Sequence, residues 1–219
     1  MQSDVGAQAR ELPLFPLNMV LFPNQSLPLH IFEPRYRIMI QRCMDNKEPF
    51  GVVLALDESH IADIGTATMI TQMERMEDGQ MNINTMGTER FRIQNWSVGA
   101  DGYLIGNVLD YPFAEPEPAD EILVRRVTQR MRRYLSLLAK SNGMRFQVDQ
   151  FPSNASQLAI FSAIALQIEI EEKQALLEQA SVAELLTLED DILADEIKIL
   201  FVMSNVIQPP QDDFIFSRN

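Results

Sequence analysis

The residues that most often perform chemistry are few in this chain and stand far apart. His30 and His60 are its only histidines and Cys43 its only cysteine, and no two of them have the short spacing of a paired metal-ligand motif. His30 lies inside the apolar run LPLHIF, which favours a packed or capping histidine. We therefore expect no metal site, although three single residues can still converge in space.

The sequence also lacks the local motifs of ATPases and serine hydrolases. No glycine is followed by lysine, as the phosphate-binding loop of the Walker A type requires. No G-x-S-x-G nucleophile elbow occurs either. We expect no catalytic residue, no cofactor and no ATP hydrolysis, and we keep a small hydrolase with an unrecognised active site as an alternative.

Carboxylates are abundant and form two short runs, residues 189–191 and 195–196, on a predicted helix. In a helical bundle such runs usually form a solvated face rather than an acid–base pair. We interpret them as a solvated face.

Positive charge is concentrated on another predicted helix. It carries five arginines: Arg125, Arg126, Arg130, Arg132 and Arg133. A phosphate-binding face is one interpretation, but residues 169–213 hold twelve acidic residues and two lysines, so packing the two segments together would neutralise both. The formal net charge of −13 also argues against a nucleic-acid or anionic-membrane partner. We favour intramolecular pairing of the arginines.

Methionines gather around one glycine, Gly79. Four of them are candidate polypeptide-binding residues, because flexible thioether side chains adapt to apolar segments of varied shape: Met73, Met76, Met81 and Met86. Met76 and Met81 lie nearest the turn and are the best candidates for exposure. From the residue pattern alone we favour ordinary core packing of the cluster, since Met81, Ile83 and Thr85 alternate as a buried strand face does.

The first half of the chain, residues 1–111, is predicted to be β-rich. Prolines at 13, 16, 23 and 28 favour extended, bulged strands at an edge or seam, and Glu33-Pro34 begins a short helix to about residue 45. Strands are predicted over residues 50–56, 65–76, 81–86, 90–96 and 103–111, with hairpin turns at Asp78-Gly79 and Asp101-Gly102. Closing these strands into a barrel would remove their edges.

The second half, residues 120–219, is predicted to be a helical bundle with a C-terminal tail. Residues 112–119 are rich in proline and acidic residues and are typical of a linker. Asp120 and Ser153 are predicted to begin two helices, Gly143 to end the first, and a Ser181–Glu184 capping box to open the last. The fold class is thus α+β, and because a signal sequence and a 20-residue apolar span are absent, we expect a cytoplasmic protein without a membrane partner.

Several motifs resemble the N-terminal, substrate-binding domain of Lon proteases. They span most of the chain: PLFPL, LPLHIFEPRY, FGVVL, DGQMNINTMGTERFRI and EEKQALLEQASVAELL. The resemblance implies a PUA-like barrel followed by a helical bundle. It also implies a non-catalytic module that binds unfolded or apolar polypeptide segments.

The resemblance covers only the substrate-binding domain of Lon proteases. The ATPase phosphate loop and the Ser-Lys protease domain of Lon have no counterpart in the sequence. We therefore expect a standalone member that serves as an adaptor in proteolysis or protein quality control, with a protease or chaperone as a further partner. RNA binding by analogy with PUA domains is an alternative that the acidic charge disfavours. The oligomeric state does not follow from the sequence.

Overall fold

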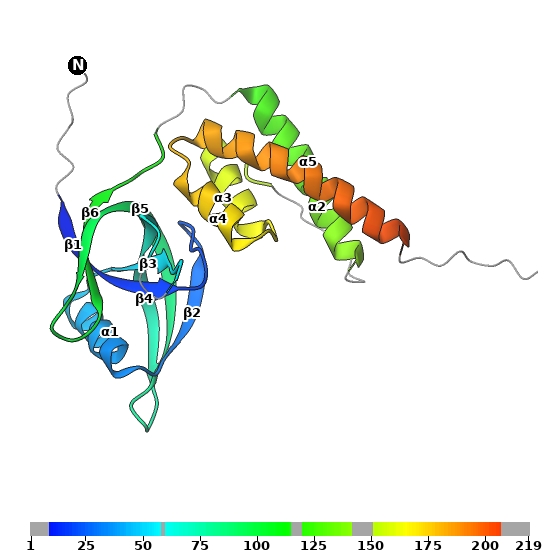
Figure 1. Cartoon of the computed structure of the whole chain (residues 1–219). Coiled ribbons are helices and arrows are strands. Elements are labelled where there is room, and N and C mark those ends of the chain that lie inside the picture. The colour runs from blue at the N-terminus through cyan, green and yellow to red at the C-terminus, as the bar shows by residue number, and fades with distance from the viewer. Residues whose placement is uncertain (1–8, 58–59, 115–119, 142–150, 207–219) are drawn as a thin grey trace, which may run out of the picture.

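The structure is a computed structural model that describes residues 9–57, 60–114, 120–141 and 151–206. Strands and one short helix form the first half, and four helices form the second (Figure 1). The elements follow in the order β1 (Arg10–Leu17), β2 (Ser26–Ile31), α1 (Pro34–Asn46), β3 (Phe50–Leu54), β4 (Ile64–Arg75), β5 (Met81–Val98), β6 (Leu104–Asp110), α2 (Glu121–Ser141), α3 (Ala155–Ala165), α4 (Ile170–Glu178) and α5 (Val182–Val206).

The strands form one sheet in the order β2-β5-β4-β3-β1-β6, and β5 also pairs with β6. The pairings therefore run from β5 through β4, β3, β1 and β6 back to β5. β5 is a single strand of 18 residues, where the sequence predicted two separate strands. It is long enough to pair with β2 and β4 along its first part and with β6 along its last part.

β2 is the outer strand, since β5 is its only partner among the described residues. Pro28 lies opposite Asn84 in the middle of this pairing. A proline has no backbone N–H to donate, so it is tolerated on such an edge.

α1 begins with Pro34 in its first turn and ends at Lys47, which adopts a left-handed conformation with φ of 56°. Its buried stripe has the predicted spacing and consists of Tyr36, Met39, Ile40 and Cys43. These side chains pack with Phe15, Phe50 and other apolar residues of the strands in one core cluster. The prediction that Cys43 is buried is confirmed.

The helix starts follow local capping rules. The Asp120 carboxylate accepts a hydrogen bond from the Ile122 N–H at 2.9 Å. Ser181 and Glu184 form the predicted capping box before α5. The prediction for α3 was one residue early, because Asn154 rather than Ser153 caps it, accepting hydrogen bonds from two backbone N–H groups. Gly143 and the tail from Gln208 lie outside the described residues.

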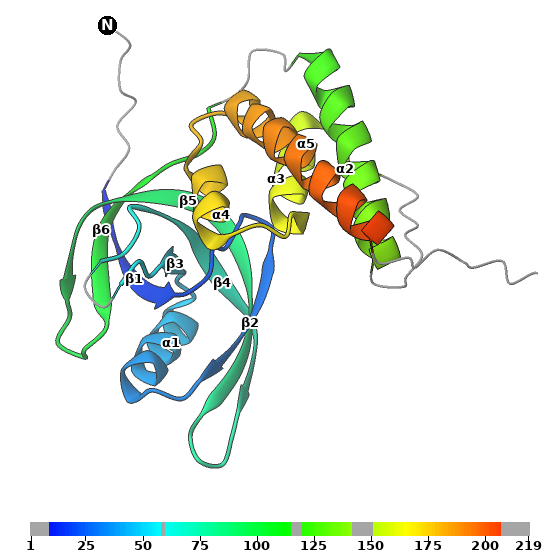
Figure 2. The same ribbon diagram turned by 45° about the vertical axis from the view of Figure 1, so that its right-hand side comes forward.

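The largest core cluster continues from the strands into the helices. It joins Phe22, Leu54 and Ile64 of the first half to helix residues such as Leu158 and Leu185. Both views place α2 and α5 side by side, with α3 and α4 between them and the sheet (Figure 2).

The junction between the halves is also bonded by polar groups. Buried Arg90 of β5 donates to the carbonyl oxygens of Leu177 and Gln179, the latter at 2.7 Å, at the end of α4. The Ala114 N–H donates to the Ala180 carbonyl oxygen at 2.8 Å. Residues 115–119 of the predicted linker lie outside the described residues, and the boundary at 112–119 stays a prediction. In the described part of the chain, no helix is both long and apolar enough to cross a bilayer.

Candidate functional site

The methionines around Gly79 divide between core and surface. Met81 is only 4% exposed and belongs to the core cluster that α1 covers, so its choice as a candidate for exposure was wrong. The alternation argument holds instead, because Met81, Ile83 and Thr85 all point inward. Met76 is 41% exposed, and Met86 is also exposed.

Met73 is half-buried beside the same core cluster. Nothing in the structure tests whether Met73, Met76 or Met86 binds polypeptide, and that role stays a prediction.

The two histidines lie at one groove, but Cys43 does not join them. His30 is exposed rather than packed, which corrects the sequence interpretation; its Nδ1 lies 2.8 Å from Asn82 Oδ1, and its ring stacks on Phe32. His60 pairs with Asp57, with Nδ1 2.8 Å from a carboxylate oxygen. Among the described residues, no group of His, Cys, Asp and Glu side chains has a geometry that could hold a metal ion.

Cys43 is also a poor nucleophile where it stands. Burial, with a smaller contribution from the nearby Glu48 carboxylate, raises the pKa of its thiol to about 11. Since the thiolate is the reactive form, this cysteine stays protonated and inert near neutral pH.

We call the hollow that holds both histidines the aromatic groove. Its volume is about 620 Å³, and it is lined by residues of β1, β2, the start of α1 and the β5–β6 turn region together with those near His60. The lining residues that carry the argument are Phe15, Phe32, Tyr36, Trp96, Val98 and Leu104. Phe32, Trp96 and Val98 are 58%, 41% and 65% exposed. Large apolar side chains gathered at one exposed hollow are typical of an interaction site.

Charges at the rim of the aromatic groove are paired with one another. Arg35 lies 2.9 Å from a Glu33 carboxylate oxygen and stacks over the Tyr36 ring at 4.6 Å. Desolvation by burial raises the pKa of Tyr36, so its hydroxyl stays protonated. Because the rim charges are balanced and the floor is aromatic, the groove suits an apolar side chain rather than an ion.

A second hollow, which we call the amide groove, adjoins the first. Its lining includes Leu29 and His30, which also line the aromatic groove, and it adds amide side chains from β4 and β5: Gln72, Asn82 and Asn84. Asn84 Nδ2 donates to Gln72 Oε1 at 2.9 Å, which leaves the other amide atoms of this pair for further bonds. Side-chain amides both donate and accept, so they match the polar groups of a peptide backbone.

The carboxylate run at 189–191 is not the solvated face that we expected. Glu189 and Asp190 are 0% and 4% exposed, and only Asp191 of the three faces solvent. Sequence reasoning missed this burial because α5 is covered on two sides.

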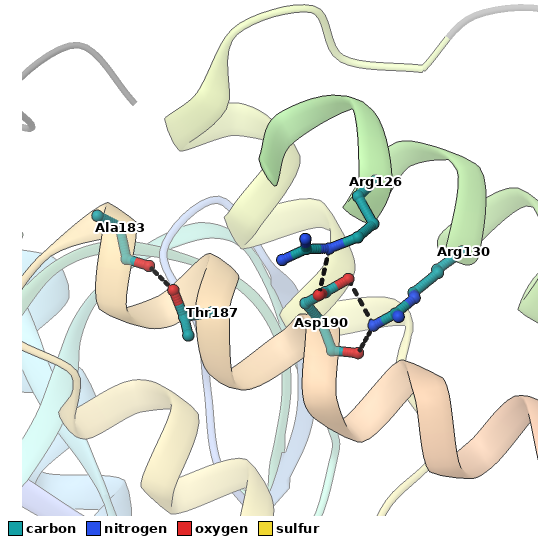
Figure 3. A network of polar contacts seen from close by, with 5 residues as sticks. All are labelled: Arg126, Arg130, Ala183, Thr187 and Asp190. Atoms are coloured by element: carbon teal, nitrogen blue, oxygen red, sulfur yellow. Dashed lines mark hydrogen bonds and ion pairs between the residues drawn. The ribbon is translucent and has the colours of Figure 1, made fainter. Parts of the chain in front are cut away.

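The expected pairing of the arginine-rich helix with the acidic segment is confirmed at Asp190. Figure 3 shows Arg126 and Arg130 of α2 reaching toward this residue on α5. Arg126 Nε lies 2.6 Å from one carboxylate oxygen of Asp190, and Arg130 Nη1 lies 2.8 Å from the other. Arg125 pairs with Glu121 instead, and Arg132 stacks over the Phe151 ring. Four of the five arginines of this helix thus have partners within the helical half of the chain.

The comparisons with known proteins point to one family. A family model described as the ATP-dependent protease La (LON) substrate-binding domain matches residues 11–195. Among curated proteins, Lon protease 2 of Thermus thermophilus is 25% identical over 215 residues, a match that covers 92% of this chain and 26% of that protein. The chain thus spans about a quarter of the length of the curated relatives that it matches.

Solved structures show the same relation. A Lon N-terminal domain protein from Xanthomonas campestris is similar with a TM-score of 0.64 and 27% identity, covering 84% of this chain and 98% of that one. The N-terminal domain of Lon protease from the Mycobacterium avium complex has a TM-score of 0.63 over 86% of this chain and 98% of its own. At 18% identity, this second likeness shows the fold alone.

Proposed function

Because the chain belongs to the family of LON substrate-binding domains, we propose that it recognises polypeptide segments of other proteins and that the aromatic groove receives their apolar side chains. The observation that carries this proposal is the exposure of Phe32, Trp96 and Val98 around one hollow of about 620 Å³. Such a hollow accepts one or two large side chains.

The amide groove supports binding of an extended chain beside this anchor. An unfolded segment has unpaired backbone N–H and C=O groups, which Gln72, Asn82 and Asn84 can satisfy without regard to sequence. Met73 lines the same groove, and Met76 lies close enough for its sulfur to contact Asn82 at 3.9 Å. Met86 adds a third adaptable side chain on the outer face of β5.

We further propose that the module acts without catalysis, as an adaptor in proteolysis or protein quality control. The matched family model describes a substrate-binding domain, which supports this role. The pairing of β5 with β6 supports the interpretation of the strands as a PUA-like barrel, to which the helices are joined.

The test is binding of an unstructured polypeptide to the double variant Phe32→Ser/Trp96→Ser. Fluorescence anisotropy with labelled casein should show a dissociation constant raised at least about tenfold, because about 1.4 kcal/mol of apolar burial is lost. The melting temperature should stay within about 2 °C, since both side chains are exposed.

Ile122→Ser is the matched control, because Ile122 is exposed on α2 and does not line the groove. Equal binding by the double variant and the control would show that the aromatic groove is not the recognition site.

A further inference from the structure

A third groove lies between α1 and the end of the β4–β5 hairpin, and we call it the arginine groove. Its volume is about 640 Å³, and the lining residues that carry the argument are Arg37, Ile38, Gln41, Arg42, Asp45 and Arg75. It uses the face of α1 opposite the buried stripe. The hairpin projects on the side away from the α2–α5 helices, next to α1 (Figures 1 and 2).

The charge of this groove is opposite to that of the whole chain. Three guanidinium groups and one carboxylate line it, whereas the chain has a formal net charge of −13. Asp45, the one carboxylate, accepts a hydrogen bond from Gln41 Nε2 at 2.7 Å. Arg42 has a carboxylate neighbour outside the groove, Asp101, at 3.6 Å.

Arg37 and Arg75 are the guanidinium groups that matter most. Within the described ranges, neither forms an ion pair with a carboxylate. Arg37 Nη1 lies 3.5 Å from the carbonyl oxygen of Asp78, and Arg75 Nη2 donates to Gln41 Oε1. Most of their ten N–H donors therefore remain available to an anion.

The turn at Gly79 leaves room for the Arg37 guanidinium. Gly79 has a φ of 82°, and a Cβ atom there would lie 2.9 Å from Arg37 Nη1. A glycine at this turn thus lets the guanidinium lie directly over the chain. Beside it, Ile38 is exposed and presents an apolar surface between the charged groups.

We propose that the arginine groove binds an acidic segment of the recognised polypeptide, in which Asp or Glu stands next to a bulky apolar residue. The carboxylate would pair with Arg37 and Arg75, and the apolar side chain would cover Ile38. The inference rests on the proposed function, because one chain would occupy both grooves. They meet at the first turn of α1, which gives Glu33 and Arg35 to one groove and Pro34 and Arg37 to the other.

A polypeptide fits the groove better than a polyphosphate chain does. Nucleic acids carry a charge at every residue and bind to extended basic surfaces. Here the positive surface is limited to three arginines, and the rest of the chain is strongly acidic. Single carboxylates flanked by apolar residues match both the small charge and the exposed Ile38.

The test compares two labelled twelve-residue peptides that differ only in whether a central phenylalanine is flanked by aspartates or by asparagines. The wild-type chain should bind the aspartate peptide about tenfold more tightly at low salt, since its two carboxylates can form ion pairs with Arg37 and Arg75. In Arg37→Gln/Arg75→Gln this preference should disappear, while affinity for the asparagine peptide is unchanged. Arg125→Gln, which removes an exposed arginine of α2, is the control and should keep the preference.

Each outcome separates the two proposals. If the asparagine peptide binds but aspartate brings no gain, or if the gain survives the double substitution, the arginine groove has no role and the proposed function stands. If neither peptide binds, both proposals fail. Displacement of the aspartate peptide by a single-stranded RNA at equal concentration would overturn the assignment to an acidic polypeptide.

Discussion

Glu189 is a buried carboxyl group in the middle of the helical half, and its environment makes the stability of the fold depend on pH. Burial raises the pKa of Glu189 well above its usual value of 4.5, and the nearby Lys173 ammonium opposes this only in part. Burial in turn lowers the pKa of Lys173 to about 8. The backbone N–H of Ala163 also opposes the rise in the pKa of Glu189, but by less than Lys173 does. The protonated form of Glu189 is therefore the one that the fold prefers.

A pKa that is higher in the folded state than in the unfolded state makes stability fall as the pH rises. The stability that Glu189 contributes is fully present below its unfolded pKa and is lost as the pH rises toward the folded pKa. In Glu189→Gln this loss cannot occur. We predict that the melting temperature of the variant, relative to that of the wild type, is at least about 2 °C higher at pH 8 than at pH 5. This corresponds to roughly 1 kcal/mol in the free energy of unfolding.

Thermal unfolding followed by circular dichroism at both pH values measures this difference. Asp195→Asn is the control, because Asp195 is exposed and pairs with Lys198 at the surface. A difference that is constant with pH in Glu189→Gln would show that the carboxyl ionises in the folded protein as freely as in the unfolded one.

Among the elements, the β4–β5 hairpin shows most clearly how strand alternation decides the role of a residue. Met76 precedes the turn and lies on the surface, and five residues later Met81 begins β5 in the core. We predict that Met81→Ala destabilises the protein by about 2–4 kcal/mol, since a buried methionine leaves a cavity. Met76→Ala should cost less than about 0.5 kcal/mol.

Urea unfolding of the two variants gives both free energies. The pair is its own control, because the same side chain is removed from the same hairpin. Similar losses in the two variants would contradict the assignment of Met81 to the core and Met76 to the surface.

Local signals predicted α1 and the hairpin well, because each depends on a few adjacent residues. Glu33-Pro34 marks the start of a helix, and Asp78-Gly79 marks a turn. The continuity of β5 through residues 87–89 was missed, because the predicted strands ended at residue 86 and began again at residue 90. A Cβ atom at Gly87 would lie 2.4 Å from the Phe22 carbonyl oxygen, so this glycine serves a close approach between distant chain segments.

The aromatic groove could not be predicted for a related reason. Its lining extends from Phe15 to Leu104, and no window of the sequence brings these residues together. The sequence suggested methionines near the turn instead, of which Met73 and Met81 line neighbouring grooves. Only the pairing of β5 with β6 places Trp96 and Val98 beside the start of α1.

At the scale of the whole molecule, Arg90 links the sheet to the helices. Its guanidinium donates to two carbonyl oxygens at the end of α4 and lies 3.2 Å from the centre of the Phe113 ring. Burial lowers its pKa to about 10, which still leaves it charged at neutral pH. Hydrogen bonds from charged donors contribute about 1.5–3 kcal/mol each.

We predict that Arg90→Met lowers stability by at least about 3 kcal/mol, or about 6 °C in melting temperature for a chain of this size. Differential scanning calorimetry measures the shift. Arg92→Met is the matched control, because Arg92 stands on the same strand and stacks on Tyr111 but is exposed. If both variants melt at the same temperature, the hydrogen bonds of Arg90 do not hold the halves together.

The edge of β2 that has no described partner bears on how readily the protein aggregates with other chains. Unfolded polypeptides have exposed backbone groups, and an open strand edge offers them a template for cross-β aggregation. Pro28 stands in the middle of β2, the one strand whose second edge has no described partner. Because a proline interrupts any continuous row of backbone hydrogen bonds, the sheet resists being extended by a misfolded chain. Under the function proposed above, this proline would limit co-precipitation of the protein with the unfolded chains that it binds.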